Sequence, residues 1–80
     1  MWSLRYTTEA TADIYLIPRG LAAEITKAIR ALQRVPVPYE ATAEPTDRPN
    51  TYMLTVEGYT ITYELVEQEQ IVKILLVEEA

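Results

Sequence analysis

The sequence predicts a single α+β domain over residues 1–80, with the element order β-α-α-β-β-β. Two changes of pattern support this order. Apolar residues recur every three to four positions between residues 8 and 34, as on one face of a helix, and at every second position between residues 50 and 65, as on one face of a strand. Four prolines between residues 35 and 49 separate these two halves. We therefore expect a helical pair that is followed by a meander of strands.

The amino-terminal segment predicts a strand and a short helix. Residues 2–7 alternate large apolar side chains with polar ones, as in a half-buried strand. Thr7 or Thr8 can then cap a helix, because a threonine hydroxyl accepts a hydrogen bond from a free backbone N–H in the first turn. Pro18 either ends this helix or starts the next one, since proline is tolerated only in the first turn.

The second helix, predicted from residue 19 to residue 34, has the clearest pattern. Its apolar stripe covers about three turns and consists of Leu21, Ile25, Ala28, Ile29 and Leu32. A second stripe at i, i+3 and i+7 is basic and consists of Lys27, Arg30 and Arg34. This basic stripe is either a solvated helix face or a patch for an acidic partner or a nucleic acid, and we include it among the predicted partner-binding residues.

Residues 35–49 are predicted to form a loop, because four prolines cannot build a helix or a central strand. Glu40, Glu44 and Asp47 in this loop could together hold a hard cation. An unpatterned segment is more often a solvated connection, so no metal site is predicted.

Residues 50–65 predict a β-hairpin that turns at Glu57-Gly58, in the middle of the sheet. Glu57 and Glu64 could form an acid-base pair, but a turn position and an outward position favour ordinary surface charge. Three tyrosines fall on the apolar side of the alternation, where core packing is a better interpretation than a stacking platform for bases. They are Tyr52, Tyr59 and Tyr63.

The last predicted strand, residues 71–77, is apolar on both faces apart from Lys73, as in an interior strand or one with a covered second face. No later segment of the sequence could cover its outer face. We therefore predict an exposed apolar patch there and place Ile74 and Leu76 in a partner-binding surface. A second chain could add a strand at a free sheet edge or lay an amphipathic helix on this face, and self-association is the alternative.

Charge and composition exclude several kinds of chemistry. The net charge of −5 divides into +2 over residues 1–34 and −7 over residues 35–80, so nucleic-acid binding is not expected of the second half. The absence of histidine and cysteine excludes Ser-His and Cys-His catalysis and most transition-metal sites, and two scattered glycines form no phosphate loop, so no cofactor is expected. No segment predicts a membrane span or a signal peptide, and we expect a soluble, cytoplasmic protein.

The order of strand, two helices, proline loop and three-stranded meander, with Leu32-x-x-Val35-Pro36-x-Pro38 closing the second helix, resembles the RelE/ParE superfamily of bacterial toxins. The segment from Tyr52 to Leu65 is similar to that family's Tyr-Arg-Leu-Arg-Val-Gly-Asp-Tyr-Arg-Ile-Ile-Tyr-Glu-Val. The resemblance implies a four-stranded, mainly antiparallel sheet with a helical hairpin on one face. It also implies pairing with an antitoxin in a type II toxin-antitoxin module, and either ribosome-dependent mRNA cleavage or, in the ParE branch, gyrase inhibition.

The residues that would carry cleavage depart from the family pattern. Thr60 stands where the family has the hairpin arginine, and Ala80 stands at or near the arginine after the last strand. Met53 and Thr55 stand where basic side chains reach toward RNA. The family's terminal helix with its catalytic tyrosine has no counterpart in residues 1–80, so no catalytic residue is assigned.

The sequence therefore predicts a toxin-like subunit that binds an antitoxin or another protein without cleaving RNA. Two alternatives stay open. One is an active mRNA endoribonuclease that uses a substitute constellation, such as Arg48 with the tyrosines. The other is a gyrase inhibitor like ParE.

Overall fold

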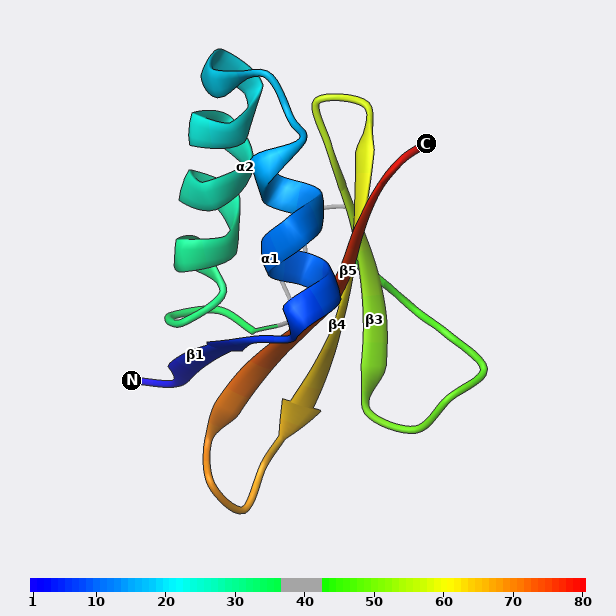
Figure 1. Ribbon diagram of the computed structural model, residues 1–80. Coiled ribbons are helices and arrows are strands. Elements are labelled where there is room, and N and C mark those ends of the chain that lie inside the picture. Colours follow the sequence, from blue (N-terminus) through cyan, green and yellow to red (C-terminus); the bar gives the residue numbers. More distant parts are fainter. Residues whose placement is uncertain (37–42) are drawn as a thin grey trace.

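The computed structural model describes residues 1–36 and 43–80 of the chain. It contains two helices and five strands (Figure 1). In chain order they are β1 (Ser3–Tyr6), α1 (Thr8–Tyr15), α2 (Arg19–Ala31), β2 (Ala43–Pro45), β3 (Thr51–Val56), β4 (Tyr59–Val66) and β5 (Ile71–Glu79). The predicted α+β class is confirmed.

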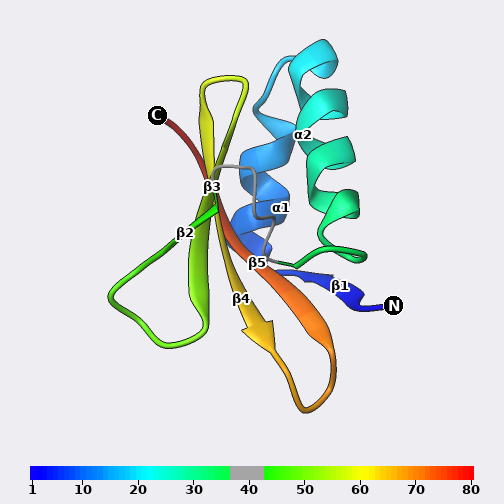
Figure 2. The ribbon, with the colours of Figure 1, turned by 180° about the vertical axis from the view of Figure 1, so that it is seen from behind.

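The strands form one mixed sheet in the order β1-β5-β4-β3-β2. The meander from β3 to β5 is antiparallel, and β1 pairs with β5 in parallel, so the chain's two ends meet in neighbouring strands. The expected four strands become five, because β2 forms inside the predicted loop and pairs with β3 (Figure 2). An edge strand needs backbone N–H groups on one side only, which allows Pro45 to end this strand.

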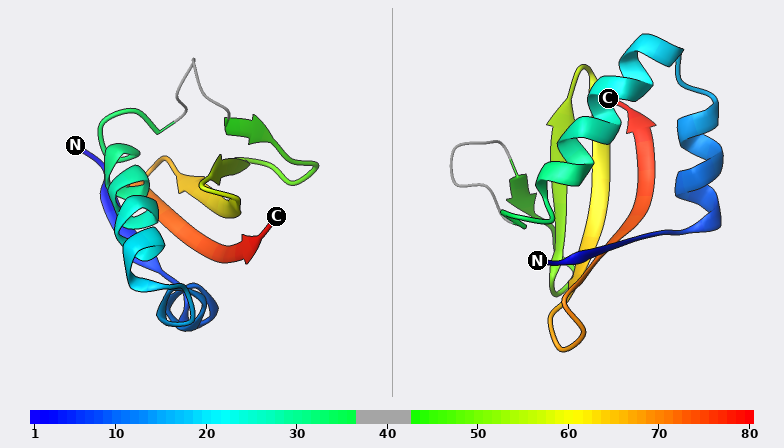
Figure 3. Two further views of the ribbon diagram at one scale, coloured as in Figure 1. Left: turned by 90° about the horizontal axis from the view of Figure 1, so that it is seen from above. Right: turned by 90° about the vertical axis from the view of Figure 1, so that its left-hand side faces the viewer.

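Both helices lie on the same face of the sheet (Figure 3), and the core fills the space between the two layers. The predicted stripe of α2 faces this core: Ile25, Ile29 and Leu32 are buried, while Leu21 and Ala28 are half-buried. The sheet contributes alternate residues of the meander. They are Leu54, Ile61, Tyr63, Leu65, Val72, Ile74 and Val77.

The hairpin between β3 and β4 turns where the sequence predicts. Glu57 and Gly58 have φ angles of 51° and 80°. Left-handed backbone at both central residues is the geometry of a two-residue turn that matches the twist of the flanking strands. This turn fixes the register in which Leu54 faces Ile61.

Helix α1 is attached to the part of β5 that β1 does not reach. The Thr7 side chain caps the helix by accepting from the Ala10 N–H, and its hydroxyl donates to the Leu75 carbonyl oxygen at 2.8 Å. Farther along α1, the Asp13 carboxylate accepts a hydrogen bond from the Val77 N–H at 3.1 Å. Since β1 ends at Tyr6, these side chains satisfy backbone groups that would otherwise form an open edge.

The prediction that Ile74 and Leu76 share an exposed face is wrong for Ile74. Ile74 pairs with Tyr63 and is completely buried. Leu76 pairs with Thr62, the residue before Tyr63 in β4, and is 37% exposed. Two residues of β5 thus advance against one of β4, which is a β-bulge at Leu75. Because the bulge inserts one residue, it reverses the alternation of β5 between its two halves.

Of the described helices, neither is long and apolar enough to cross a membrane.

Candidate partner-binding surfaces

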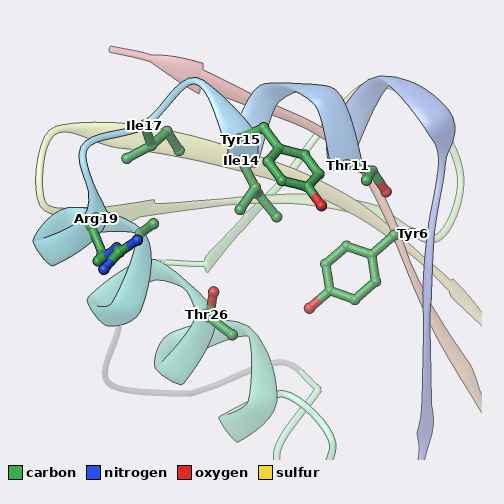
Figure 4. A pocket seen from close by; sticks show the side chains of 8 residues that line it. Tyr6, Thr11, Ile14, Tyr15, Ile17, Arg19 and Thr26 are labelled. Atoms are coloured by element: carbon green, nitrogen blue, oxygen red, sulfur yellow. The ribbon is translucent and has the colours of Figure 1, made fainter.

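A groove of about 550 Å³ opens between α1 and α2, on the side of the helices that faces away from the sheet's centre (Figure 4). Its floor is apolar, and tyrosine rings from β1 and α1 stand beside it. We call it the α1–α2 groove. Its lining residues are Tyr6, Thr11, Ile14, Tyr15, Ile17, Arg19, Ala22 and Thr26.

Large apolar side chains remain exposed where α1 ends beside this groove. Tyr15 and Leu16 are 85% and 84% exposed, although Ile17 directly after them is buried. An α1 of eight residues has too few turns to bury a complete apolar stripe. The end of α1 therefore offers apolar surface to a partner, and sequence periodicity alone did not single it out.

A basic rim borders the groove along α2. Arg19, Lys27 and Arg30 recur at i, i+8 and i+11 on the exposed side of the helix, and Arg34 follows in the turn after it. Three of these residues belonged to the predicted basic stripe, and the structure adds Arg19.

Two further hollows, of about 470 and 380 Å³, extend the α1–α2 groove along this rim. The first shares Arg19, Ala22 and Thr26 with the groove, and the second shares Lys27 and Arg30 with the first. The three hollows therefore form one continuous surface. Among the described residues, no acidic side chain lines any of them, so the whole surface is electropositive.

Tyr6 connects the apolar and the basic parts of this surface. Burial raises the pKa of the Tyr6 hydroxyl, and the nearby Arg30 guanidinium acts in the opposite direction. The hydroxyl therefore stays protonated at neutral pH. It remains available as a hydrogen-bond donor or acceptor at the edge of the groove.

The opposite side of the sheet has no described helix on it, and we call it the open face (Figure 1). Strand register places Leu76, Thr62 and Met53 side by side in one row across it. The next row toward the β3–β4 turn contains Glu78, Thr60 and Thr55. The row on the other side contains Arg5, Lys73, Glu64 and Thr51.

The four positions that depart from the toxin pattern lie around the open face. Three of them lie in the two rows nearest the β3–β4 turn. They are Met53 and the directly paired Thr55 and Thr60. Ala80 lies at the same end, where its N–H donates to the Gly58 carbonyl oxygen at 2.8 Å. The described residues place no cation in these two rows, so this part of the sheet has no positive charge to stabilise a phosphate.

Two of the tyrosines considered for a substitute catalytic site with Arg48 pack against each other. Tyr63 is buried, its hydroxyl donates to the Pro36 carbonyl oxygen at 2.6 Å, and its ring stacks on Tyr52 with centroids 5.8 Å apart. Burial, with a smaller effect from Tyr52, raises the pKa of Tyr63 to about 12. Both rings belong to the face that the helices cover, so the interpretation of Tyr63 as a core tyrosine is confirmed.

The acidic loop residues form no cation site within the described part of the chain. Glu40 lies outside the described residues, and Glu44 lies in β2 on the open face, opposite Met53. Within residues 1–36 and 43–80, no three carboxylates gather in one place.

No protein-family model and no curated protein sequence matches the chain. Solved structures do match it along its whole length. The intact RelBE toxin-antitoxin complex of E. coli contains a chain with a TM-score of 0.86 and 17% identity, and the match covers 100% of this chain and 98% of that chain. The RelBE2 complex of Mycobacterium tuberculosis gives 0.81 and 24%, covering 99% and 98%.

The chromosomal ParDE system of P. aeruginosa gives a TM-score of 0.74 at 22% identity, and the match covers 100% of this chain and 97% of that chain. At these identities the likeness establishes the fold. This chain therefore has the fold of the RelE and ParE toxins, and the resemblance read from the hairpin is confirmed at that level.

Proposed function

We propose that this chain is the toxin-like subunit of a bacterial type II toxin-antitoxin module, that it acts in the cytoplasm by binding an antitoxin-like protein, and that it does not cleave RNA. The fold supports the first part, because the matched structures are those of toxin-antitoxin systems.

The observation that carries the binding role is the continuous electropositive surface along α2. An amphipathic helix fits such a surface when its apolar residues enter the α1–α2 groove over Ile14 and Ala22 and its acidic residues face Arg19 and Arg30. Apolar contact then provides most of the affinity. The charges fix the register and accelerate association. The predicted partner is therefore a protein with an acidic amphipathic segment.

The open face supports the absence of cleavage. A phosphodiester that is being cleaved gains negative charge, which cationic side chains must stabilise. No positive charge comes from the uncharged Thr60, Thr55 and Met53 on this face. The neighbouring Glu78 repels a phosphate.

The test of the binding role uses the product of the reading frame beside the gene of this chain. Isothermal titration should show a complex whose Kd rises with salt concentration. Arg30→Glu and Lys27→Glu should each weaken it by about tenfold, because each reverses one charge at the rim. Arg48→Glu is the matched control, since Arg48 is also exposed but lies in the turn between β2 and β3. Equal affinities for the three variants, or no complex at all, would contradict the proposed surface.

A further inference from the structure

The centre of the open face is uncharged and partly apolar. Met53 and Leu76 are 38% and 37% exposed and lie on either side of Thr62 in one row. Thr55 and Thr60 continue this surface toward the hairpin turn. Short β-branched side chains lose little conformational freedom when they are covered, so this centre is suited to close packing against a flat surface.

The charges around this centre are arranged symmetrically along β5. Glu78 lies one row nearer to the β3–β4 turn than Leu76, and Lys73 lies one row farther from this turn than Leu76. The bulge at Leu75 makes these two spacings equal, because it places Leu76 rather than Leu75 in the row after Lys73 on this face. A basic and an acidic residue therefore stand at the same distance on opposite sides of one apolar row.

We propose that the open face packs against the open face of a second copy of this chain, about a two-fold axis that runs along the row Leu76-Thr62-Met53. Rotation about this axis keeps each strand over its own counterpart and exchanges the rows above and below. Lys73 of one copy then faces Glu78 of the other, twice in the dimer. An interface of this kind is self-complementary, as two-fold symmetry requires.

The neighbouring strands agree with the same axis. In β4, Glu64 of one copy faces Thr60 of the other. In β3, Thr51 of one copy faces Thr55 of the other. Among the described residues, the like charges brought opposite each other are the two Glu44 side chains, which lie on the exposed edge strand β2 at the end of the axis row and therefore at the rim of the interface. The row that contains Arg5, Lys73 and Glu64 has a net positive charge and faces a row whose only charge is Glu78.

The size of the face sets the strength of the dimer. Four strands spaced by about 4.8 Å, over about 20 Å of strand length, give a face of roughly 400 Å² in each copy. Such an interface belongs to the small and weakly bound class. The dimer is therefore reversible and depends on concentration. The helices, with the α1–α2 groove, lie on the other side of the sheet and stay free.

Sedimentation velocity of the purified chain, between about 1 and 500 µM, tests the proposal, because this range brackets weak association. The sedimentation coefficient should rise from that of the monomer to that of the dimer. Thr62→Glu should give a monomer at every concentration, since the two introduced carboxylates meet at the axis. Thermal melting must show that this variant is folded, as expected for a half-exposed position.

A charge exchange identifies the orientation. Lys73→Glu and Glu78→Lys should each weaken the dimer by about tenfold, and the double variant should regain the parent's affinity, because the exchange restores both pairs. Lys27→Glu on α2 is the control and should have no effect.

Three outcomes would overturn the proposal. They are a monomer at the highest concentration, a dimer that tolerates Thr62→Glu, and a double variant as weak as the single ones. If the chain is monomeric and Thr62→Glu instead abolishes binding of the neighbouring gene product, the open face belongs to that partner. Because the sedimentation experiments contain the chain alone, they can fail while the proposed antitoxin binding holds.

Discussion

Tyr63 connects the sheet to the segment that follows α2. Its ring is buried beside Tyr52, and its hydroxyl reaches the Pro36 carbonyl oxygen, which lies 27 residues earlier in the chain. The hydrogen bond joins the sheet to a residue of the segment after the second helix, and thereby helps to fix where the chain leaves that helix. The alternation of the hairpin predicts that Tyr63 faces the core. It cannot predict the acceptor, because that depends on the path of a proline-containing loop.

Tyr63→Phe should alter the dependence of stability on pH. In the unfolded chain a tyrosine ionises near pH 10, whereas burial raises the pKa of folded Tyr63 to about 12. Between these values only the unfolded chain loses the proton, so Tyr63 reduces the parent's stability as the pH rises from about 10 to about 12, and its contribution is complete below pH 10.

The Tyr63→Phe variant lacks this loss. At neutral pH it should be about 0.5–1.5 kcal/mol less stable than the parent, because one hydrogen bond is missing. Urea unfolding should show this difference shrinking above about pH 10. Tyr15→Phe, at an exposed position, is the control and should follow the parent throughout. A constant difference between the parent and Tyr63→Phe at all pH values would contradict the assigned burial.

At the scale of elements, the fold depends on how α2 covers the sheet. Its buried stripe ends at Leu32, which caps the helix, and the turn after it reaches β1: the Trp2 N–H donates to the Gln33 carbonyl oxygen, and the Gln33 side chain donates to the Trp2 carbonyl oxygen. Leu32 thus belongs to the core at the point where helix, turn and first strand meet.

Leu32→Ala should destabilise the protein by about 2–5 kcal/mol, because it removes a buried side chain and leaves a cavity. A core of this size contributes only about 3–5 kcal/mol in total, so the variant should be largely unfolded at physiological temperature. Val35→Ala, at an exposed position three residues later, is the control. A thermal melt in which Leu32→Ala is as stable as the parent would exclude this packing of α2.

The elements that local pattern determines could be predicted from the sequence, and those that depend on pairing could not. The stripe of α2 and the turn at Glu57-Gly58 follow from the residues themselves. Strand β2 requires β3 as a neighbour, and the bulge at Leu75 appears only when β5 is aligned with β4. That bulge is why Ile74 was assigned to the wrong face, and a strand that is apolar on both faces gives no polar residue to reveal it.

At the scale of the whole molecule, charge separates the two sides of the protein. The basic rim follows α2, while the carboxylates lie mainly in the strands and turns of the second half. The rim could be predicted from helical spacing, although its continuity with the α1–α2 groove depends on where α1 ends. The open face combines an uncharged centre with three carboxylates, Glu44, Glu64 and Glu78. They outnumber its two cations, Arg5 and Lys73, so the charge on the side where the resemblance would place RNA disfavours a polyanion.

The purified chain should therefore leave messenger RNA intact on translating ribosomes. Cleavage needs cations beside the scissile phosphate and a group that transfers a proton, and the described positions that the family pattern and the core tyrosine would offer for these roles do not fit them. Thr60 and Met53 are uncharged, and the pKa of Tyr63, near 12, keeps its proton on a buried hydroxyl. The measurement is the mapping of message ends after incubation at low salt, with an active RelE-type toxin as the positive control. Thr60→Arg restores one cation among several missing groups, so it should also leave the message uncut. Codon-periodic cuts by the parent chain that disappear in Arg48→Ala or Tyr52→Phe would instead place an active site at the turn before β3 and establish the enzyme.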